Sequence, residues 1–227
     1  MVIRVAVEQE IFRGNREWAM RNRAMLQMHQ VCAVNLMSSP GAGKTSVLER
    51  AIPQLAVRLR TVVIEGDVMT ALDAERIAVL GIPAVQINTR GACHLDAKMI
   101  HDVLVKLPLA EIDLLLIENV GNLVCPADFE LGEQLRVTVL SVTEGEDKVE
   151  KYPYIFRKAD AVLLNKTDLL PYVPFDVPRF RKELWQANPD VEVIHTSAST
   201  GEGIDSWTDW LIRRANFIPQ KSESDSK

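Results

Sequence analysis

The 227-residue sequence predicts a doubly wound α/β domain, in which helices cover both faces of a mostly parallel sheet. Short apolar runs, bounded by turn-forming residues, alternate along the chain with amphipathic stretches. Each run is nearly continuous in apolar residues, as expected of a strand that is buried on both faces of a parallel sheet. The chain length suits a single domain of this class.

Seven of these runs are predicted strands. In chain order they are VCAVNLM from Val31, TVVIE from Thr61, AVQI from Ala84, DLLLIE from Asp113, VTVLSV from Val137, AVLLN from Ala161 and VEVIH from Val191. Most of the intervals are amphipathic, and the predicted helices are Ser46–Leu59, Leu72–Leu80, Leu95–Leu107, Val149–Lys158, Arg179–Ala187 and Ile204–Arg214. Upstream, a further amphipathic helix is predicted from Val7 to His29, with apolar residues that include Ile11, Trp18, Met25 and Leu26.

The composition narrows the possible partners and the location. With 47% hydrophobic and 25% charged residues, the chain has the make-up of a folded globular protein. A formal net charge of −5 argues against a nucleic-acid or membrane-surface partner, since both need a clustered basic face. The N-terminus lacks the pattern of a signal peptide, and no apolar run approaches the roughly 20 residues of a membrane helix. We therefore expect a cytoplasmic protein.

The segment SSPGAGKT, from Ser38 to Thr45, follows the first predicted strand and opens a predicted helix. This is the context of a Walker A phosphate loop, so the fold is predicted to be that of a P-loop NTPase. Lys44 is expected to neutralise phosphate charge and Thr45 to hold Mg²⁺. Ser38 replaces the first glycine of the motif, at an expected modest cost to the turn; a chance glycine-rich turn is the alternative. The predicted nucleotide contacts here are Pro40, Gly41, Ala42, Gly43, Lys44, Thr45 and Ser46.

A second motif indicates the base. Asn165-Lys166-Thr167-Asp168 follows a predicted strand, and such an NKxD sequence places a carboxylate against the two N–H donors of guanine, which adenine does not present. After the next strand, Ser197 and Ala198 are placed where a backbone amide can donate to the guanine carbonyl oxygen. We predict that Asn165, Lys166, Asp168, Ser197 and Ala198 bind GTP or GDP, against the alternative of a turn with a capping Asp168.

Two acids lie at predicted strand ends, Asp67 and Glu118. With Thr45 they form a plausible Mg²⁺ set, because Mg²⁺ takes one or two carboxylates besides phosphate oxygens and water. The alternative for Asp67 is that it only caps the next helix. Gly121 is expected to offer its N–H to the terminal phosphate. The predicted catalytic residues are Lys44, Asp67 and Glu118, and Asp67 is expected to position water. Turnover is expected to be slow, because no arginine finger can be assigned.

Cys93-His94 and Cys125 fall in loops that are expected to sense the nucleotide. Thiolate and imidazole together suit Ni²⁺, Zn²⁺ or Cu(I), although from the residues alone the two cysteines could equally be ordinary buried thiols. Three ligands do not close a tetrahedral site, so a fourth is expected from water, from Asp96 or from a second subunit. The position one helical turn after His94 is Lys98. Cys32, inside an apolar strand, is predicted to be a core residue.

Several segments closely resemble the HypB family, GTPases that help deliver nickel during maturation of [NiFe] hydrogenases. They are SSPGAGKT, VIEGD, GACHLDA, IENVGNLVCPADF, LSVTEGEDKVEKYP, LLNKTDLLPY and TSASTGEGIDSWTDWL, and the resemblance runs from Glu17 to Leu211. It implies a GTP-dependent homodimer with Ni²⁺ or Zn²⁺ at Cys93, His94 and Cys125 near the subunit interface. It also implies a HypA-type nickel chaperone and the hydrogenase large subunit as partners.

On this view residues 1–30 form an N-terminal helical extension, residues 31–216 a P-loop G domain and residues 217–227 a disordered tail. Three other functions stay open. The chain could be a urease-type nickel-delivery GTPase, although NLVCP and CHLD speak against it, or a metal-binding interaction protein in which GTP hydrolysis is vestigial. A P-loop kinase of a small molecule is disfavoured by the guanine motif at Asn165–Asp168.

Overall fold

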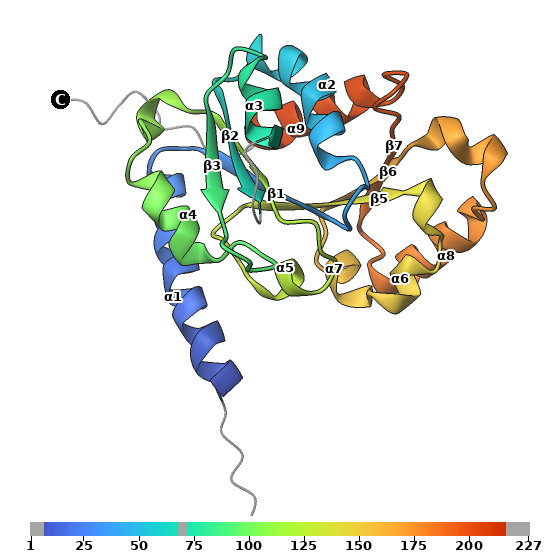
Figure 1. Ribbon diagram of the computed structural model, residues 1–227, viewed down its shortest axis with the longest axis horizontal. Helices are drawn as coiled ribbons and strands as arrows, with labels where there is room; N and C mark the ends of the chain where they lie inside the picture. The colour runs from blue at the N-terminus through green and yellow to red at the C-terminus, as the bar shows by residue number, and fades with distance from the viewer. Residues whose placement is uncertain (1–6, 68–71, 217–227) are drawn as a thin grey trace, which may run out of the picture.

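A computed structural model describes residues 7–67 and 72–216. Its centre is one seven-stranded sheet in the order β3-β2-β4-β1-β5-β6-β7, and every pair of neighbouring strands is parallel (Figure 1). The strands are β1 (Cys32–Ser38), β2 (Thr61–Asp67), β3 (Ala84–Asn88), β4 (Leu114–Glu118), β5 (Leu135–Ser141), β6 (Ala161–Asn165) and β7 (Glu192–His195). The predicted doubly wound α/β fold is confirmed.

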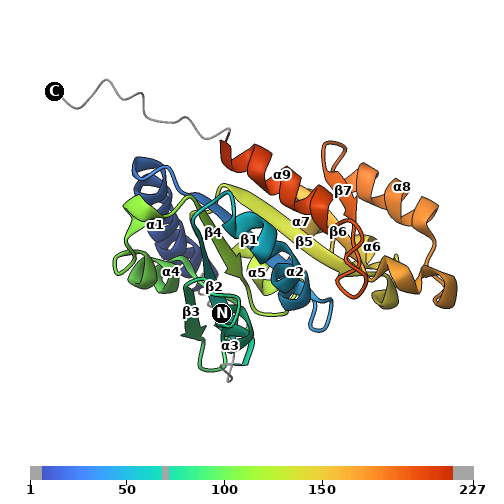
Figure 2. The same ribbon diagram turned by 90° about the horizontal axis from the view of Figure 1, so that it is seen from above.

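Helices cover both faces of this sheet. They are α1 (Val7–Met28), α2 (Lys44–Ala56), α3 (Leu72–Ala78), α4 (Ala97–Leu104), α5 (Cys125–Asp128), α6 (Lys148–Lys151), α7 (Pro153–Arg157), α8 (Val177–Ala187) and α9 (Ile204–Asn216). Figure 1 shows α2, α3 and α9 on one side of the sheet, and the view in Figure 2 shows α2 and α9 running side by side. The other side is covered by α1 and α4 over one half of the sheet and by α7 and α8 over the other half.

The core is divided between these two faces. On one face the side chains of α2 and α9, among them the fully buried Trp207, pack on alternate residues of β1 such as Val34 and Leu36. On the other face Ala33 of β1 lies in the cluster under α1 and α4, and Met37 lies in the cluster under α7 and α8. Because β1 is buried on both faces, each of its residues is apolar or internally hydrogen-bonded, which explains its continuous apolar sequence.

The helix boundaries differ from the predictions where one residue interrupts the periodic pattern. The predicted helix Val149–Lys158 is two short helices, α6 and α7, because Pro153 has no N–H to donate within a helix and begins the second one. The predicted helix from Leu95 begins instead at Ala97, because the side chain of Asp96 accepts a hydrogen bond from the N–H of Met99 and caps it.

Parallel pairing brings the carboxyl ends of the strands to one edge of the sheet. β1 lies between β4 and β5, so the loop after Ser38 has the loop after Glu118 on one side and the ends of β5 and β6 on the other. Sheets of this type bind their ligands at this edge. None of the helices among the described residues is long and apolar enough to cross a membrane. The predicted tail at 217–227 lies outside the described residues.

Candidate nucleotide and metal site

The loop between β1 and α2 is built as an anion site. Gly43, the residue before α2, has a left-handed backbone (φ 99°), and no side chain of the described residues caps the helix start. A Cβ at Gly43 would lie 2.5 Å from the Asn165 amide nitrogen, so only glycine fits. The open N–H groups at the start of a 13-residue helix suit a phosphate group.

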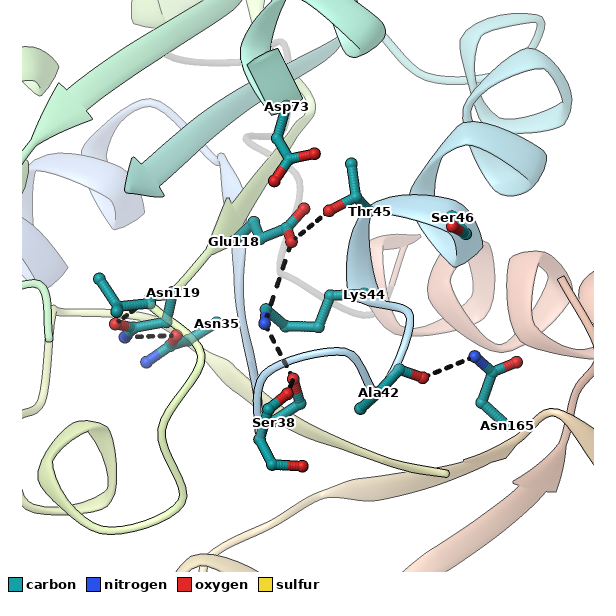
Figure 3. Close-up of polar contacts among 12 residues, drawn as sticks. Asn35, Ser38, Ala42, Lys44, Thr45, Ser46, Asp73, Glu118, Asn119 and Asn165 are labelled. Carbon is teal, nitrogen blue, oxygen red and sulfur yellow. Dashed lines mark hydrogen bonds and ion pairs between the residues drawn. The ribbon is translucent and has the colours of Figure 1, made fainter. Parts of the chain in front are cut away.

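Lys44 and Thr45 meet one carboxylate at the bottom of this loop (Figure 3). Thr45 Oγ1 donates to Glu118 Oε1 at 2.7 Å, and Lys44 Nζ lies 4.0 Å from the same oxygen. Lys44 Nζ also donates to the hydroxyl of Ser38 at 2.8 Å. Ser38 has no positive φ. Its backbone therefore does not need the glycine usually found there, and its hydroxyl instead helps to hold the lysine.

Glu65 is a residue of this site that our sequence reasoning missed. It lies in β2 beside Glu118 and is only 2% exposed. Burial, followed by the neighbouring Glu118 carboxyl, raises the pKa of Glu65 above its ordinary value. Glu65 Oε1 and Glu118 Oε2 have no hydrogen-bond partner within the described part of the chain. The signal in the sequence was a glutamate directly after the apolar run VVI of β2.

The donor set at this point suits Mg²⁺. The buried carboxyl groups of Glu65 and Glu118 offer oxygens without partners, Thr45 adds a hydroxyl, and Asp67 lines the same cleft at the end of β2. Mg²⁺ prefers such hard oxygen ligands. The cleft has a volume of about 540 Å³, and Figure 3 shows Asp73 of α3 directed toward the Thr45–Glu118 pair.

Gly121 brings the loop after β4 against the phosphate loop. A Cβ at Gly121 would lie 3.0 Å from Pro40 Cα and 3.1 Å from Pro40 N. Both residues line the cleft. The predicted terminal-phosphate contact and the predicted phosphate loop are therefore brought together.

The NKxD segment is tied to the phosphate loop by two hydrogen bonds. Asn165 Nδ2 donates to the Ala42 carbonyl at 2.9 Å, and Lys166 Nζ donates to the Gly41 carbonyl at 2.8 Å. Lys166 has a left-handed backbone (φ 61°), which turns the chain sharply after β6. These two hydrogen bonds thus hold the predicted base-recognition segment beside the predicted phosphate loop.

Asp168 is held in position by two hydroxyls. Ser197 Oγ donates to Asp168 Oδ1 at 2.6 Å, and Ser199 Oγ donates to Oδ2 at 3.0 Å. The hydrogen bond from Ser197 is the main cause that lowers the pKa of Asp168, so the side chain stays ionised. The N–H of Ala198 donates to Asn165 Oδ1 at 3.3 Å, which places the second predicted base-binding segment beside the first. Our sequence reasoning did not find Ser199.

The three predicted soft ligands also converge. The sulfur atoms of Cys93 and Cys125 and a ring nitrogen of His94 all lie within 4.8 Å of one another, although Cys125 comes from a different loop. A hydrogen bond with Cys93, followed by burial, raises the pKa of Cys125, and burial lowers the pKa of His94. His94 is therefore neutral near pH 7, and its Nδ1 lies 3.6 Å from the sulfur of Cys93. Thiolates with imidazole suit Ni²⁺ or Zn²⁺.

Asp96, the side chain predicted as a possible fourth ligand, is engaged elsewhere, and so are the nearby Lys98 and His101. Asp96 caps α4, and Lys98 Nζ contacts both carboxylate oxygens of Asp102 at 2.5 and 2.6 Å. His101 Nδ1 lies 3.0 Å from Asn22 Oδ1, and its ring packs on Trp18. Among the described residues the cluster therefore has three ligands, which leaves a position for water or a second subunit. Cys32 is buried in the core, as predicted.

Comparison with known proteins agrees with this geometry. The family model CobW/HypB/UreG, nucleotide-binding domain, matches residues 32–195. The chain is 52% identical over 208 residues to hydrogenase maturation factor HypB of Azotobacter vinelandii, covering 92% of this chain and 69% of that protein. It resembles the crystal structure of HypB from Archaeoglobus fulgidus (TM-score 0.83, 43% identity, covering 89% of this chain and 99% of that one). It also resembles that of HypB from Helicobacter pylori in complex with nickel (TM-score 0.84, 35% identity, 93% and 99% covered).

The fold and the phosphate loop thus define a P-loop nucleotide-binding protein. Within that class, the chain belongs to the HypB family of hydrogenase maturation factors. The resemblance seen in the sequence is confirmed.

Proposed function

We propose that this protein is a GTP-hydrolysing switch that assists nickel insertion into [NiFe] hydrogenase, and that the nucleotide controls metal binding at Cys93, His94 and Cys125. The single observation that carries this coupling is the position of Asn119. Its side chain is 1% exposed and accepts a hydrogen bond from the N–H of Leu95, next to His94, at 3.0 Å. Asn119 also lines the phosphate cleft, so a movement of the loop after β4 reaches both Cys125 and His94.

Each predicted residue has a defined task in this proposal. Thr45, Asp67 and Glu118 hold Mg²⁺, directly or through water, and the ion supplies positive charge to the phosphates. Lys44 stabilises the charge that develops on the transferred phosphoryl group, Asp67 positions water, and Gly121 contacts the terminal phosphate. Asn165, Lys166, Asp168, Ser197 and Ala198 bind the guanine. Coupling between GTP and metal is reciprocal, so metal alters the affinity for GTP by the same factor.

The proposed location and partners rest on the resemblance to the HypB family. We propose a cytoplasmic protein that dimerises with GTP and receives Ni²⁺ from a HypA-type chaperone before acting on the hydrogenase large subunit. Three ligands per chain support a shared site, because a second subunit can complete the coordination. The competing function is a metal-binding interaction protein in which hydrolysis is vestigial. It predicts GTP binding without turnover.

The central test measures Ni²⁺ and Zn²⁺ affinity of the wild type, Cys93→Ala and Cys125→Ala, each with GDP and with a non-hydrolysable GTP analogue. Loss of one of three ligands is expected to weaken Ni²⁺ binding by about 100-fold or more, and the wild-type affinity is expected to depend on the nucleotide. Cys32→Ala is the matched control, because that thiol lies in the core and burial raises its pKa to about 12. Equal wild-type affinity in both nucleotide states contradicts the coupling and leaves partner docking as the role of GTP.

Gly121→Ala is expected to weaken binding of the GTP analogue by about tenfold, or ~1.4 kcal/mol, while GDP affinity changes little. The added Cβ meets backbone atoms of Pro40, so the loop must move away from the terminal phosphate. Titration calorimetry with both nucleotides measures the difference. Gly14→Ala is the control, since a Cβ there has nothing within 4 Å. An equal loss for GDP and the analogue would show that Gly121 does not sense the terminal phosphate.

A further inference from the structure

The face of α1 that packs on the domain contains two buried asparagines. Asn15 is 8% exposed and Asn22 is fully buried, and they lie seven residues apart in line with Phe12, Ala19 and Leu26. Burying an amide is costly unless its donors and acceptor are all used. Two polar residues on the inner face of an amphipathic helix therefore indicate a specific task.

Both amides connect the same two segments of the domain. Asn15 accepts from the N–H of Ala97 at 2.8 Å and donates to the carbonyl of Glu130 at 2.8 Å. Asn22 donates to the carbonyl of Ala97 at 2.7 Å and to that of Leu131 at 2.8 Å. Each side chain thus connects the start of α4 to the loop segment at residues 130–131.

These two segments carry the metal ligands. Ala97 lies three residues after His94, and Glu130 lies five residues after Cys125. A third contact from α1 reaches the site through one intervening ring. The Phe12 ring packs on Phe129, with centroids 5.3 Å apart, and Phe129 packs on the ring of His94 at 3.9 Å.

Close packing leaves little space between α1 and the chain after Leu131. Gly132 has a positive φ of 100°, and a Cβ there would lie 2.5 Å from Asn22 Cβ and 2.8 Å from the carbonyl oxygen of Ala19. The backbone after Leu131 therefore approaches α1 as closely as a glycine allows. Neither segment can shift without breaking hydrogen bonds to a buried amide.

We propose that α1 is a clamp that sets the distance between the His94 and Cys125 segments, and that Asn15 and Asn22 are positioning residues of the metal site. This inference rests on the proposed metal binding at Cys93, His94 and Cys125. Metal affinity falls steeply when ligands are misplaced, and loss of outer-shell hydrogen bonds commonly costs 10- to 100-fold. The helix that precedes the nucleotide-binding core is thereby part of the metal site.

The test compares Asn22→Leu and Asn15→Ala with wild type and with Gln27→Ala, which removes an exposed amide from the outer face of the same helix. Ni²⁺ affinity, the thiolate-to-Ni²⁺ charge-transfer spectrum, metal-free GTP affinity and the thermal midpoint are measured for each. We expect Ni²⁺ affinity to fall by about 10- to 100-fold with an altered spectrum, while GTP affinity stays within about twofold of wild type. Gln27→Ala is expected to match wild type in all four.

The outcomes separate this inference from the proposed function. Unchanged Ni²⁺ affinity and spectrum in folded, GTP-binding Asn15→Ala overturn the clamp, whether or not Asn22→Leu folds. The proposed metal site fails if the wild type shows no thiolate-to-Ni²⁺ band, or if the band persists in Cys125→Ala. The clamp then fails with it. A fall in thermal midpoint without a change in the spectrum of the loaded protein would assign the asparagines to stability alone and would also overturn the clamp.

Discussion

Asp168→Asn is expected to lower GTP affinity by a factor on the order of 10²–10⁴ and to raise affinity for xanthosine triphosphate. In the proposed function, the ionised carboxylate of Asp168 accepts from the two N–H donors of the guanine edge. An asparagine keeps one acceptor and presents an amide donor, which opposes the guanine amino group and matches the second carbonyl of xanthine. Ser197 and Ser199 hold the side chain by their hydroxyls, so the asparagine occupies the same position.

Competition between the two nucleotides for the wild type and the variant measures this exchange. The matched control is Asp176→Asn, the same chemical change at the cap of α8, where the side chain accepts from the N–H of Arg179. That variant is expected to keep GTP selectivity and lose some thermal stability. If Asp168→Asn retained full GTP affinity, then the NKxD segment would be a structural turn, and the assignment of guanine would have to be withdrawn.

Lys44→Ala is expected to reduce GTP hydrolysis by a factor on the order of 10³ and to weaken GTP binding as well. Lys44 is the cation of the phosphate loop and lies beside the buried Glu118. In the proposed function its loss removes the charge that offsets both the bound phosphates and this carboxyl group. The remaining carboxylate then faces the phosphates without Lys44, so repulsion adds to the loss of attraction.

Phosphate release under single-turnover conditions checks this, with GTP binding measured separately. Lys182→Ala removes an exposed lysine from α8. It is expected to leave both the rate of phosphate release and GTP binding unchanged. Turnover in Lys44→Ala within tenfold of the wild type would place the catalytic charge elsewhere. Absence of turnover in the wild type itself would favour the metal-binding interaction protein over the switch.

The parts of the fold that follow from local patterns were predictable. Strands such as β1 and β6 are continuous apolar runs, and the motifs from Ser38 to Thr45 and from Asn165 to Asp168 are contiguous in the chain. Helix boundaries that depend on one turn residue or cap were less predictable. The division of one predicted helix into α6 and α7 at Pro153 shows this. Leu26 is buried, as the amphipathic pattern suggested. Asn15 and Asn22 lie on the same face, but their burial could not be predicted because they are polar.

The rest of the site depends on contacts between distant segments. Glu65 becomes notable only because strand pairing places it beside Glu118, and Asn119 only because its amide reaches the backbone of Leu95. The convergence of Cys93 and Cys125 likewise depends on how two loops are packed. Such contacts leave no periodic trace in the sequence, so only a polar residue in an apolar context gives a hint.

The central place of β1 has a consequence for how the chain acquires its shape during synthesis. Cys32 pairs with Leu114 and Val34 with Leu135, so both partners of the first strand are made long after it. At roughly 5–20 residues per second, a ribosome needs several seconds to deliver them. During that interval the nascent chain presents an apolar strand with both edges open, which is the kind of surface that chaperones bind and that neighbouring nascent chains can join. We expect this protein to depend more on ribosome-associated holding than a protein whose strands pair in order of synthesis.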